Sequence, residues 1–413
     1  MAKCFPFLSG LGINLNNIKL RFILINLYMN FPKQLSEKLN QRNQNQSLRK
    51  LTPQNNLIDF SSNDYLGFSN SEIIFNKTHQ YLLDNTIKQN GATGSRLLSG
   101  NHKVYQETEE FIASFHQSET ALIFNSGYDA NIGFFSSVPQ RNDIIVFDEL
   151  CHASIRDGIT MSNAKSYKFQ HNDLQDLEKR LQFCHTERSR SASLEIFIVT
   201  ESVFSMDGDS PDLENLVKLA TEYNCLLVID EAHAVGVFGE RGEGLIQELN
   251  LQNQVFARII TFGKALGCHG SAILGSEELK NYLVNFARSF IYTTGLSPHS
   301  VATILIAYQE LENQKSAIQQ LKTNIQFFNQ QKTLLSLKQV FVRNKSAIQS
   351  AIIPGNEKVK LIASQLQQNG FDVKAILSPT VPEDQERLRF CLHSYNSEKE
   401  IIDVLSLLST FVF

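Results

Sequence analysis

The stretch LEIFIVTESVFSMDGDSPDLENLVKLATEYNCLLVIDEAHAVG, residues 194–236, decides the fold of this chain. It contains two apolar runs of strand length, 194–202 and 225–231, both rich in Ile, Val and Leu. Apolar residues between these runs recur at helical spacing, which predicts a helix with Ser210 as its N-cap and Pro211 in its first position. Two strands joined by a helix are the unit from which parallel sheets are built.

The same alternation extends on both sides of this stretch. Further apolar runs of strand length are TALIFN (120–125), DIIVFD (143–148), KSYKF (165–169), ARIITFG (257–263) and GSAILGS (270–276). Together with the two runs above, they predict an α/β fold with a mostly parallel seven-stranded sheet. Because most runs are apolar at successive positions, we expect helices to cover both faces of the sheet.

The pattern changes beyond Pro298. The expected elements there are a long helical stretch to about residue 337, a strand within 346–355, a helix over 356–369, strands near 372–377 and 387–392, and a last helix from about residue 397. We therefore expect an N-terminal segment at 29–70, a large domain at 71–300 and a smaller α+β domain at 301–413.

The composition is typical of a globular protein. A formal net charge of −4 gives no electrostatic argument for binding to nucleic acid or to an anionic membrane. The longest apolar stretch near the N-terminus, FILINLYMNFP (22–32), is too short to span a bilayer. The six cysteines lie far apart without a C-x-x-C pair, which suits reduced thiols in a cytoplasmic protein rather than disulfides or a zinc site.

Two segments do not follow the pattern of the rest. Residues 1–28 are interpreted as a disordered extension, with Met29 as the physiological start. The segment CHTERSRSAS (184–193) is rich in Arg and Ser and is interpreted as a solvated loop insertion, with a phosphate-binding loop as the alternative.

Several strand ends carry polar groups, and ligands of parallel α/β sheets bind at those ends. Lys264 follows one run and is either a surface lysine or a buried amine of lowered pKa that can act as a nucleophile. Asp230 ends another run and either caps the next turn or pairs with an organic cation. A metal bound by Asp230, Glu231 and His233 is disfavoured, because side chains on alternating faces do not converge. We predict no metal site.

Two further strand ends complete a pattern. In FNSGYDANIG (124–133), Gly127 opens a helix whose free N–H groups suit a phosphate, although any strand–turn–helix favours such residues. His152 follows a third strand and is either structural or catalytic. The glycine-rich stretch 91–101 follows no clear strand and so is no dinucleotide fingerprint. An amine, a carboxylate, a flat ring and a helix start are together what pyridoxal 5′-phosphate requires.

The chain resembles the α-oxoamine synthases, which are fold-type-I transferases dependent on pyridoxal phosphate. The resemblance covers nearly everything from about residue 33 to the C-terminus. The motifs that carry it, in family order, are NDYLG, GSRLLSGNH, NSGYDAN, CHAS, TESVFSMDGD, DEAHAVG, TFGKALG and FARSFIYTTGLSP. The segments FSMDGDSPDL, HNDLQDL and SPTVPEDQERLRFCL are most similar to the member of the family that acts in biotin biosynthesis.

The resemblance assigns a role to each matching residue. Lys264 would bond the cofactor aldehyde and later act as a base, Asp230 would pair with the ring nitrogen, and His152 would stack on the ring and polarise a carbonyl. The other cofactor-binding residues implied are Gly127, Tyr128, Ser205, His233, Thr261 and Thr294, the last reaching the phosphate of the neighbouring subunit. The substrate-binding residues implied are Arg49, Asn63, Thr380 and Arg389, of which Arg389 would clamp the amino-acid carboxylate.

The implied activity is the condensation of L-alanine with a pimeloyl thioester to 8-amino-7-oxononanoate, CO2 and a free thiol, in a homodimer with sites at the subunit interface. Glycine with acetyl-CoA, glycine with succinyl-CoA, and serine with a long acyl thioester remain alternatives, because family members that use them share these motifs. A non-catalytic subunit would lack Lys264. A nicotinamide-dependent dehydrogenase would show G-x-G-x-x-G after its first strand. The acyl carrier is either coenzyme A or a carrier protein.

Overall fold

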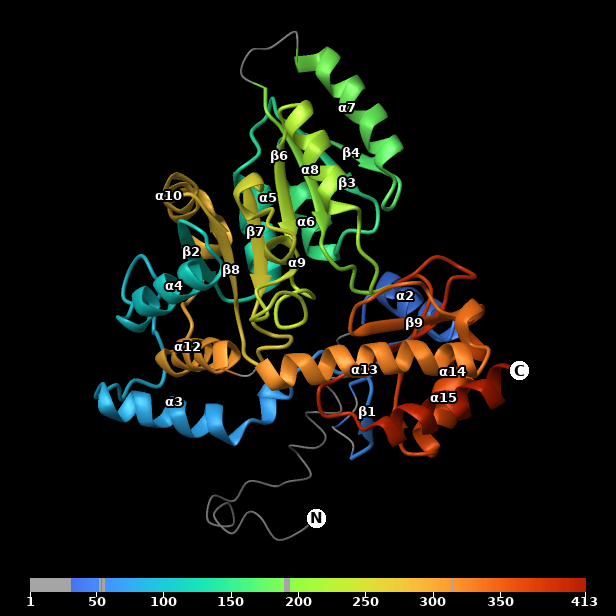
Figure 1. The fold of residues 1–413 in the computed structure, drawn as a ribbon. Helices are drawn as coiled ribbons and strands as arrows, with labels where there is room; N and C mark the ends of the chain where they lie inside the picture. The colour runs from blue at the N-terminus through green and yellow to red at the C-terminus, as the bar shows by residue number, and fades with distance from the viewer. Residues whose placement is uncertain (1–30, 52, 54–55, 189–193, 314) are drawn as a thin grey trace, which may run out of the picture.

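The computed structural model describes residues 31–413 except 52, 54–55, 189–193 and 314 (Figure 1). The predicted extension at 1–28 and the predicted start at Met29 therefore lie outside the described residues. Within the described part of the chain, no helix is both long and apolar enough to cross a membrane.

A seven-stranded sheet forms the centre of the large domain. In spatial order its strands are β2 (Thr120–Phe124), β8 (Ser271–Gly275), β7 (Ala257–Thr261), β6 (Leu226–Asp230), β5 (Ile196–Glu201), β3 (Ile144–Asp148) and β4 (Lys165–Phe169). Only β8 runs antiparallel to its neighbours, β2 and β7. The predicted mostly parallel sheet is confirmed, with every strand in its expected place.

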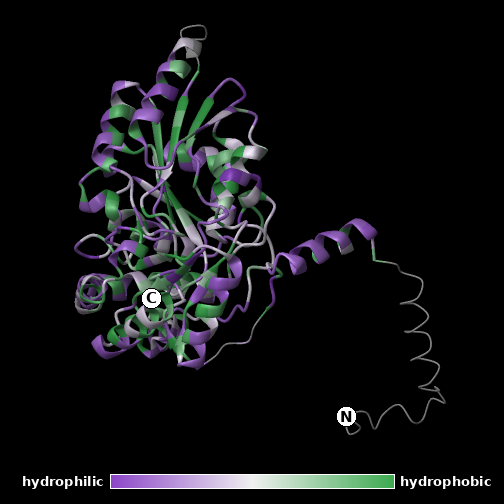
Figure 2. Ribbon diagram, turned by 90° about the vertical axis from the view of Figure 1, so that its right-hand side faces the viewer, coloured by the Kyte–Doolittle hydropathy of each residue, from purple (hydrophilic) through white to green (hydrophobic). Residues whose placement is uncertain are grey.

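Helices cover both faces of this sheet (Figure 1). On β3, Ile145 and Phe147 pack in one apolar cluster with α5 (Gly127–Ser137) and α6 (Ala153–Met161). Ile144 and Val146 point the other way, into a cluster with α7 (Leu174–Arg188) and α8 (Leu213–Glu222). The strands form a hydrophobic band between these helices (Figure 2), and alternating side chains of one strand therefore build two cores.

Two local predictions are wrong. Helix α8 is capped by Asp212, whose carboxylate accepts from the Asn215 N–H, and not by Ser210. The segment 184–193 is not wholly a loop, because its first residues, 184–188, continue α7. Cys184 is fully buried and extends the apolar face of α7 formed by Leu177 and Leu181. The remaining residues of that segment lie outside the described ones.

The small domain carries its own antiparallel sheet, ordered β11 (Lys374–Ile376), β12 (Arg387–Cys391) and β9 (Ile348–Ile352). Strand β1 (Ile58–Asp59) pairs with β10 (Phe371–Asp372), which attaches the N-terminal segment to this domain. The predicted strand near 372–377 is thus two short strands. The domain boundaries themselves remain a prediction.

The remaining α-helices of the described residues lie around these sheets (Figure 1). They are α2 (Lys33–Gln44), α3 (Glu72–Asp84), α4 (Val104–Phe115), α9 (Leu245–Glu248), α10 (Glu277–Phe286), α11 (Arg288–Ile291), α12 (Pro298–Asn313), α13 (Lys315–Leu334), α14 (Asn356–Gln368) and α15 (Glu398–Val412). The long helical stretch expected beyond Pro298 is two helices, α12 and α13. Helix α2 buries no residue and projects from the body (Figure 2).

Candidate active site

The polar groups predicted at strand ends meet at one edge of the large sheet. Asp230 ends β6 and lies directly opposite Glu201, the last residue of β5. Lys264 follows the end of the neighbouring strand β7. Because parallel strands end at the same edge, all three residues lie at the edge of the sheet where ligands of such folds bind.

Asp230 is buried and is held by two donors. Its Oδ2 accepts from Asn131 Nδ2 on α5 at 2.9 Å, and its Oδ1 accepts from the Ala232 N–H at 2.9 Å. Such donors stabilise the ionised carboxylate. Asn131 also donates to Ser154 Oγ at 3.0 Å. The sequence analysis missed Asn131, although it ends the motif NSGYDAN.

Lys264 is partly buried between the fully buried Phe262 and Ala265. Burial, together with the positive charge of Arg389, lowers the pKa of its amine, although Asp230 acts in the opposite direction. A lysine of lowered pKa is a better nucleophile and base near neutral pH.

His152 and Glu201 form a second pair at this edge. His152 is the N-cap of α6, its N–H donates to Glu201 Oε1 at 2.6 Å, and its Nδ1 lies 2.7 Å from Ser154 Oγ. Burial, then the charge of Asp230, raises the pKa of Glu201 well above its ordinary value. The ring of His152 lines a cavity of about 190 Å³, whose other lining residues include Ser205 and Thr380. Glu201 was not predicted from the sequence.

His233 is buried and neutral. Burial, with the nearby charge of Lys264, lowers the pKa of its imidazole well below the ordinary range. Tyr65, whose own pKa is raised by burial, lies with its hydroxyl 2.7 Å from His233 Nδ1. The same hydroxyl also lies 3.3 Å from Asn63 Oδ1, to which it can donate. When His233 Nδ1 accepts from the phenol, the imidazole carries its proton on Nε2 and can donate it to a ligand. Tyr65 belongs to the motif NDYLG but was not singled out.

The predicted phosphate turn lies beside β7. Helix α5 begins at Gly127, and Ser126 caps it by accepting from the Asp129 N–H at 3.0 Å. A Cβ placed on Gly127 would lie 3.7 Å from Thr261 Oγ1, so the helix start and Thr261 are neighbours. The first N–H groups of a helix have no intrahelical acceptor and suit an anion. The side chain of Tyr128 points away to Asp157, to which its hydroxyl donates at 2.8 Å.

Arg389 on β12 connects three distant parts of the chain. Its Nε donates to the Ser205 carbonyl oxygen at 2.7 Å, and its Nη2 donates to Asn63 Oδ1 at 2.9 Å. It is only 8% exposed. Among the described residues, no Asp or Glu oxygen lies within 4.0 Å of its guanidinium nitrogens. A buried guanidinium without an anionic partner suits the carboxylate of a small substrate.

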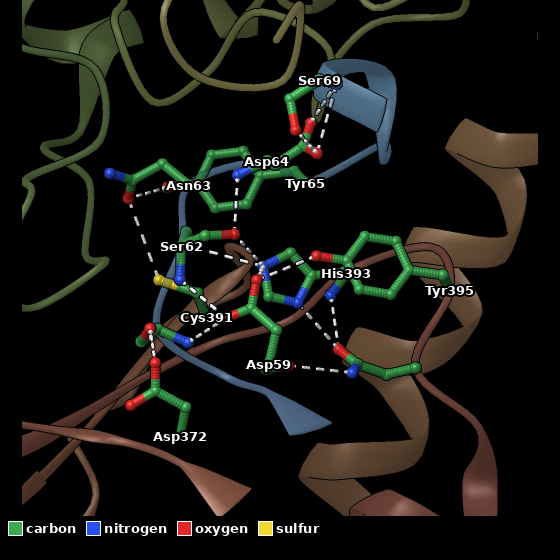
Figure 3. Close-up of polar contacts among 12 residues, drawn as sticks. Asp59, Ser62, Asn63, Asp64, Tyr65, Ser69, Asp372, Cys391, His393 and Tyr395 are labelled. Carbon is green, nitrogen blue, oxygen red and sulfur yellow. Dashed lines mark hydrogen bonds and ion pairs between the residues drawn. The ribbon is translucent and has the colours of Figure 1, made fainter. Parts of the chain in front are cut away.

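A polar network fixes the segment that carries Asn63 and Tyr65 (Figure 3). Asp59 Oδ1 accepts from the Ser61 and Ser62 N–H groups at 2.8 and 2.9 Å. From the small domain, Asn396 Nδ2 donates to the Asp59 carbonyl oxygen at 3.1 Å. The two site residues are therefore held by contacts made elsewhere in the fold.

The remaining predicted residues lie at the periphery. Arg49 Nη2 donates to Thr380 Oγ1 at 3.5 Å, and both side chains are exposed beside a second cavity of about 540 Å³. Thr294 is exposed, and its carbonyl oxygen accepts from Asn125 Nδ2 at 2.6 Å, next to the start of α5. Thr380 thus lines both this second cavity and the one beside His152, whereas Arg49 and Thr294 lie away from the residues around Lys264.

The donor set fits pyridoxal phosphate. It offers an amine for the aldehyde, a buried carboxylate for the ring nitrogen, an imidazole for the ring oxygen, a flat ring and a helix start for the phosphate. These groups come from Lys264, Asp230, His233, His152 and the turn at Gly127.

Comparisons with known proteins agree with this chemistry. Residues 55–405 match the family model described as aminotransferase class I and II. The chain is 38% identical to an 8-amino-7-oxononanoate synthase from Emericella nidulans over 92% of this chain and 95% of that protein. A solved 8-amino-7-oxononanoate synthase from Francisella tularensis superimposes with a TM-score of 0.72 at 30% identity, covering 86% of this chain and 98% of that one. A serine palmitoyltransferase variant from S. paucimobilis, solved with a bound PLP–myriocin aldimine, gives a TM-score of 0.79 at 25% identity, covering 86% and 87%.

Proposed function

This chain belongs to the aminotransferase class I and II family, and from that premise we propose that it joins L-alanine to a pimeloyl thioester with loss of CO2. The products are 8-amino-7-oxononanoate, an intermediate of biotin biosynthesis, and a free thiol. The names of the curated relatives support these substrates. The observation that carries the chemistry is that Arg389 and Asp230 both lie close enough to Lys264 for their charges to act on its amine.

The cofactor is pyridoxal 5′-phosphate, which serves as an electron sink when a proton leaves the Cα of a bound amino acid. Lys264 would hold its aldehyde, Asp230 its ring nitrogen and the start of α5 its phosphate. His233 would donate Nε2–H to its ring oxygen, and His152 would lie against its ring.

Arg389 binds the carboxylate of the amino acid. Two of its N–H groups are fixed by Ser205 and Asn63, which sets the plane of the guanidinium. The remaining N–H groups can bind the substrate carboxylate. Holding the carboxylate in one place restricts the orientation of the Cα proton. This restriction lowers the entropic part of the activation barrier.

Lys264 moves the proton. Its lowered pKa makes the neutral amine available to remove the Cα proton and later to return one to the product. Asp230 is held in place by hydrogen bonds from Asn131 Nδ2 and from the Ala232 N–H, both of which donate to its carboxylate oxygens. His152, capping α6 at the cleft, polarises the thioester carbonyl during the condensation.

The quaternary arrangement is part of the same proposal. The protein acts in the cytoplasm as a homodimer, with Thr294 reaching the phosphate bound by the neighbouring subunit. Arg49, which donates to Thr380 beside the outer cavity, meets the acyl substrate. The acyl group arrives on coenzyme A or on a carrier protein, since both present the thioester chemistry that the reaction needs.

The test is a substrate matrix. Purified enzyme loaded with pyridoxal phosphate is incubated with alanine, glycine or serine against pimeloyl-, acetyl-, succinyl- and palmitoyl-CoA, and thiol release is followed. We expect the highest kcat/KM for alanine with the pimeloyl thioester. A preference for serine with palmitoyl-CoA, or for glycine with either short acyl group, would overturn the substrate assignment while leaving the reaction class intact.

A further inference from the structure

The loop formed by residues 204–209, called here the 204–209 loop, connects the active site to the small domain. Its Ser205 carbonyl oxygen accepts from Arg389 Nε at 2.7 Å, and its Met206 carbonyl oxygen accepts from Ser350 Oγ at 2.5 Å. Asp207 forms an ion pair with Arg387. The loop therefore carries the acceptor that orients the arginine proposed to bind substrate.

The loop also packs closely against β9. Gly208 has a φ of +72°, and a Cβ placed there would lie 2.3 Å from the Ile348 carbonyl oxygen. Asn344 Nδ2 donates to the Asp207 carbonyl oxygen at 2.7 Å. A displacement of the loop would therefore move β9 and, through strand pairing, β12, which carries Arg389.

On the other side, His171 anchors the loop to the large domain. Its Nδ1 lies 2.9 Å from Asp148 Oδ1, and its Nε2 lies 2.9 Å from Asp209 Oδ2. An imidazole whose two nitrogens both face carboxylate oxygens can donate to both only when it carries a proton on each, which makes it a cation. Asn172 Nδ2 lies 3.2 Å from Nε2 on the same side. Phe204, the first residue of the loop, meets the ring edge-on at 4.4 Å between centroids.

The charges around His171 favour this protonated form. Burial alone would lower the pKa of its imidazole, but the hydrogen bonds to Asp148 and Asp209 outweigh burial and raise the pKa to about 9. The other charged groups that face it are Glu149, whose Oε1 accepts from the His171 N–H at 3.3 Å, and Glu201 at the end of β5. Loss of the proton would leave a nitrogen lone pair directed at a carboxylate, which is repulsive.

Resting on the proposed function, we propose that protonated His171 is a positioning residue for the amino-acid carboxylate: it holds Asp209, Asp209 holds the 204–209 loop, and the loop orients Arg389. His171 belongs to the segment HNDLQDL and the loop to the segment FSMDGDSPDL, both of which resemble the family member of biotin biosynthesis. In the structure His171, the first residue of HNDLQDL, contacts Asp209, the second of the three aspartates in FSMDGDSPDL.

The proposal is tested with a carboxylate that lacks an amine. Propionate stays ionised above pH 6. Any change in its affinity between pH 7 and pH 10 therefore arises from ionisation of groups on the protein. Its dissociation constant is measured by calorimetry on the holoenzyme, together with KM and kcat for alanine. The variants are His171→Gln and Asp209→Asn. The control is His185→Gln, at an exposed histidine of α7 whose Nε2 lies 2.9 Å from the Tyr223 carbonyl oxygen.

We expect both test variants to bind propionate about tenfold more weakly and to raise KM for alanine to a similar extent, as for the loss of one charge-assisted hydrogen bond. The control should match the wild type. Wild-type affinity for propionate should fall as pH rises through about 9, and this fall should be absent in His171→Gln. The double variant should bind no more weakly than Asp209→Asn, because His171 acts through Asp209, which also accepts from Asn172 Nδ2 at 2.7 Å.

Several results would overturn the proposal. One is unchanged propionate affinity in Asp209→Asn, a variant that also serves if His171→Gln does not fold. Another is an alkaline loss of affinity that persists in His171→Gln. A third is an NMR titration of the His171 ring with a midpoint near the ordinary 6.5. If the wild type fails to condense alanine yet binds propionate in this His171-dependent way, the proposed function fails and the positioning role stands.

Discussion

Replacing Glu201 by glutamine is expected to stabilise the protein, and more strongly as pH rises. Glu201 is 3% exposed and lies opposite Asp230. Burial and the charge of Asp230 raise the pKa of its carboxyl well above the ordinary 4.5. The folded protein therefore keeps this group protonated at pH values where the unfolded chain ionises it. Because the folded pKa is the higher one, the carboxyl contributes its full stability below about pH 4.5 and loses it as pH rises toward the folded pKa.

The magnitude follows from the same linkage. Each pH unit inside this window removes about 1.4 kcal/mol of stability from the wild type. Between pH 5 and pH 7 the wild type should therefore lose stability relative to Glu201→Gln for as long as the pH stays below the folded pKa of this carboxyl. Glutamine keeps a side-chain oxygen that can accept from the His152 N–H, now at 2.6 Å, so the hydrogen bond is retained. Activity should stay within about threefold of the wild type.

The assay is urea unfolding at pH 5, 6 and 7 and at one protein concentration. The matched control is Glu214→Gln, at an exposed position in the first turn of α8. Its stability should run parallel to that of the wild type. A difference between Glu201→Gln and wild type that stays constant or shrinks from pH 5 to pH 7 would refute the reasoning, because it would mean that Glu201 is ionised beside Asp230.

Further predictions concern the groups around the cleft. Lys264→Ala should abolish turnover and remove the visible absorbance at about 420 nm that the cofactor shows when bonded to an amine; full activity would contradict the assignment of the base. Asp230→Asn should lower kcat by about a thousandfold or more, measured in thiol release under saturating alanine, because a neutral side chain cannot keep the ring nitrogen protonated. Arg389→Lys should raise KM for alanine about tenfold while the melting temperature changes little, since an ammonium cannot reproduce the planar fork; an unchanged KM would argue against carboxylate binding. Tyr65→Phe should cost about 1–3 kcal/mol in urea unfolding, because His233 Nδ1 loses its partner inside the protein.

Much of the architecture could be predicted from local patterns. The strand before Asp230 and the strand before Lys264 are apolar runs whose length and composition fix their type. Because helices separate these strands along the chain, the sequence predicted that Asp230 and Lys264 both lie at one edge of the sheet.

The predictions that proved wrong also concerned local features. Asp212, not Ser210, caps α8, and residues 184–188 continue α7 because Cys184 keeps the helical apolar spacing.

The sequence by itself determined which residue types stand at the strand ends, because periodicity and turn chemistry act over a few neighbouring positions. Only the tertiary structure decided which groups hold them. Asn131 reaches Asp230 across 99 positions, and Asn63 reaches Arg389 across 326. Hydrogen bonds of this kind depend on how whole elements pack, and no local pattern encodes them. The ionisation of Lys264, and of the carboxyl group at the end of β5, follows from the same packing, since burial and neighbouring charge set a pKa.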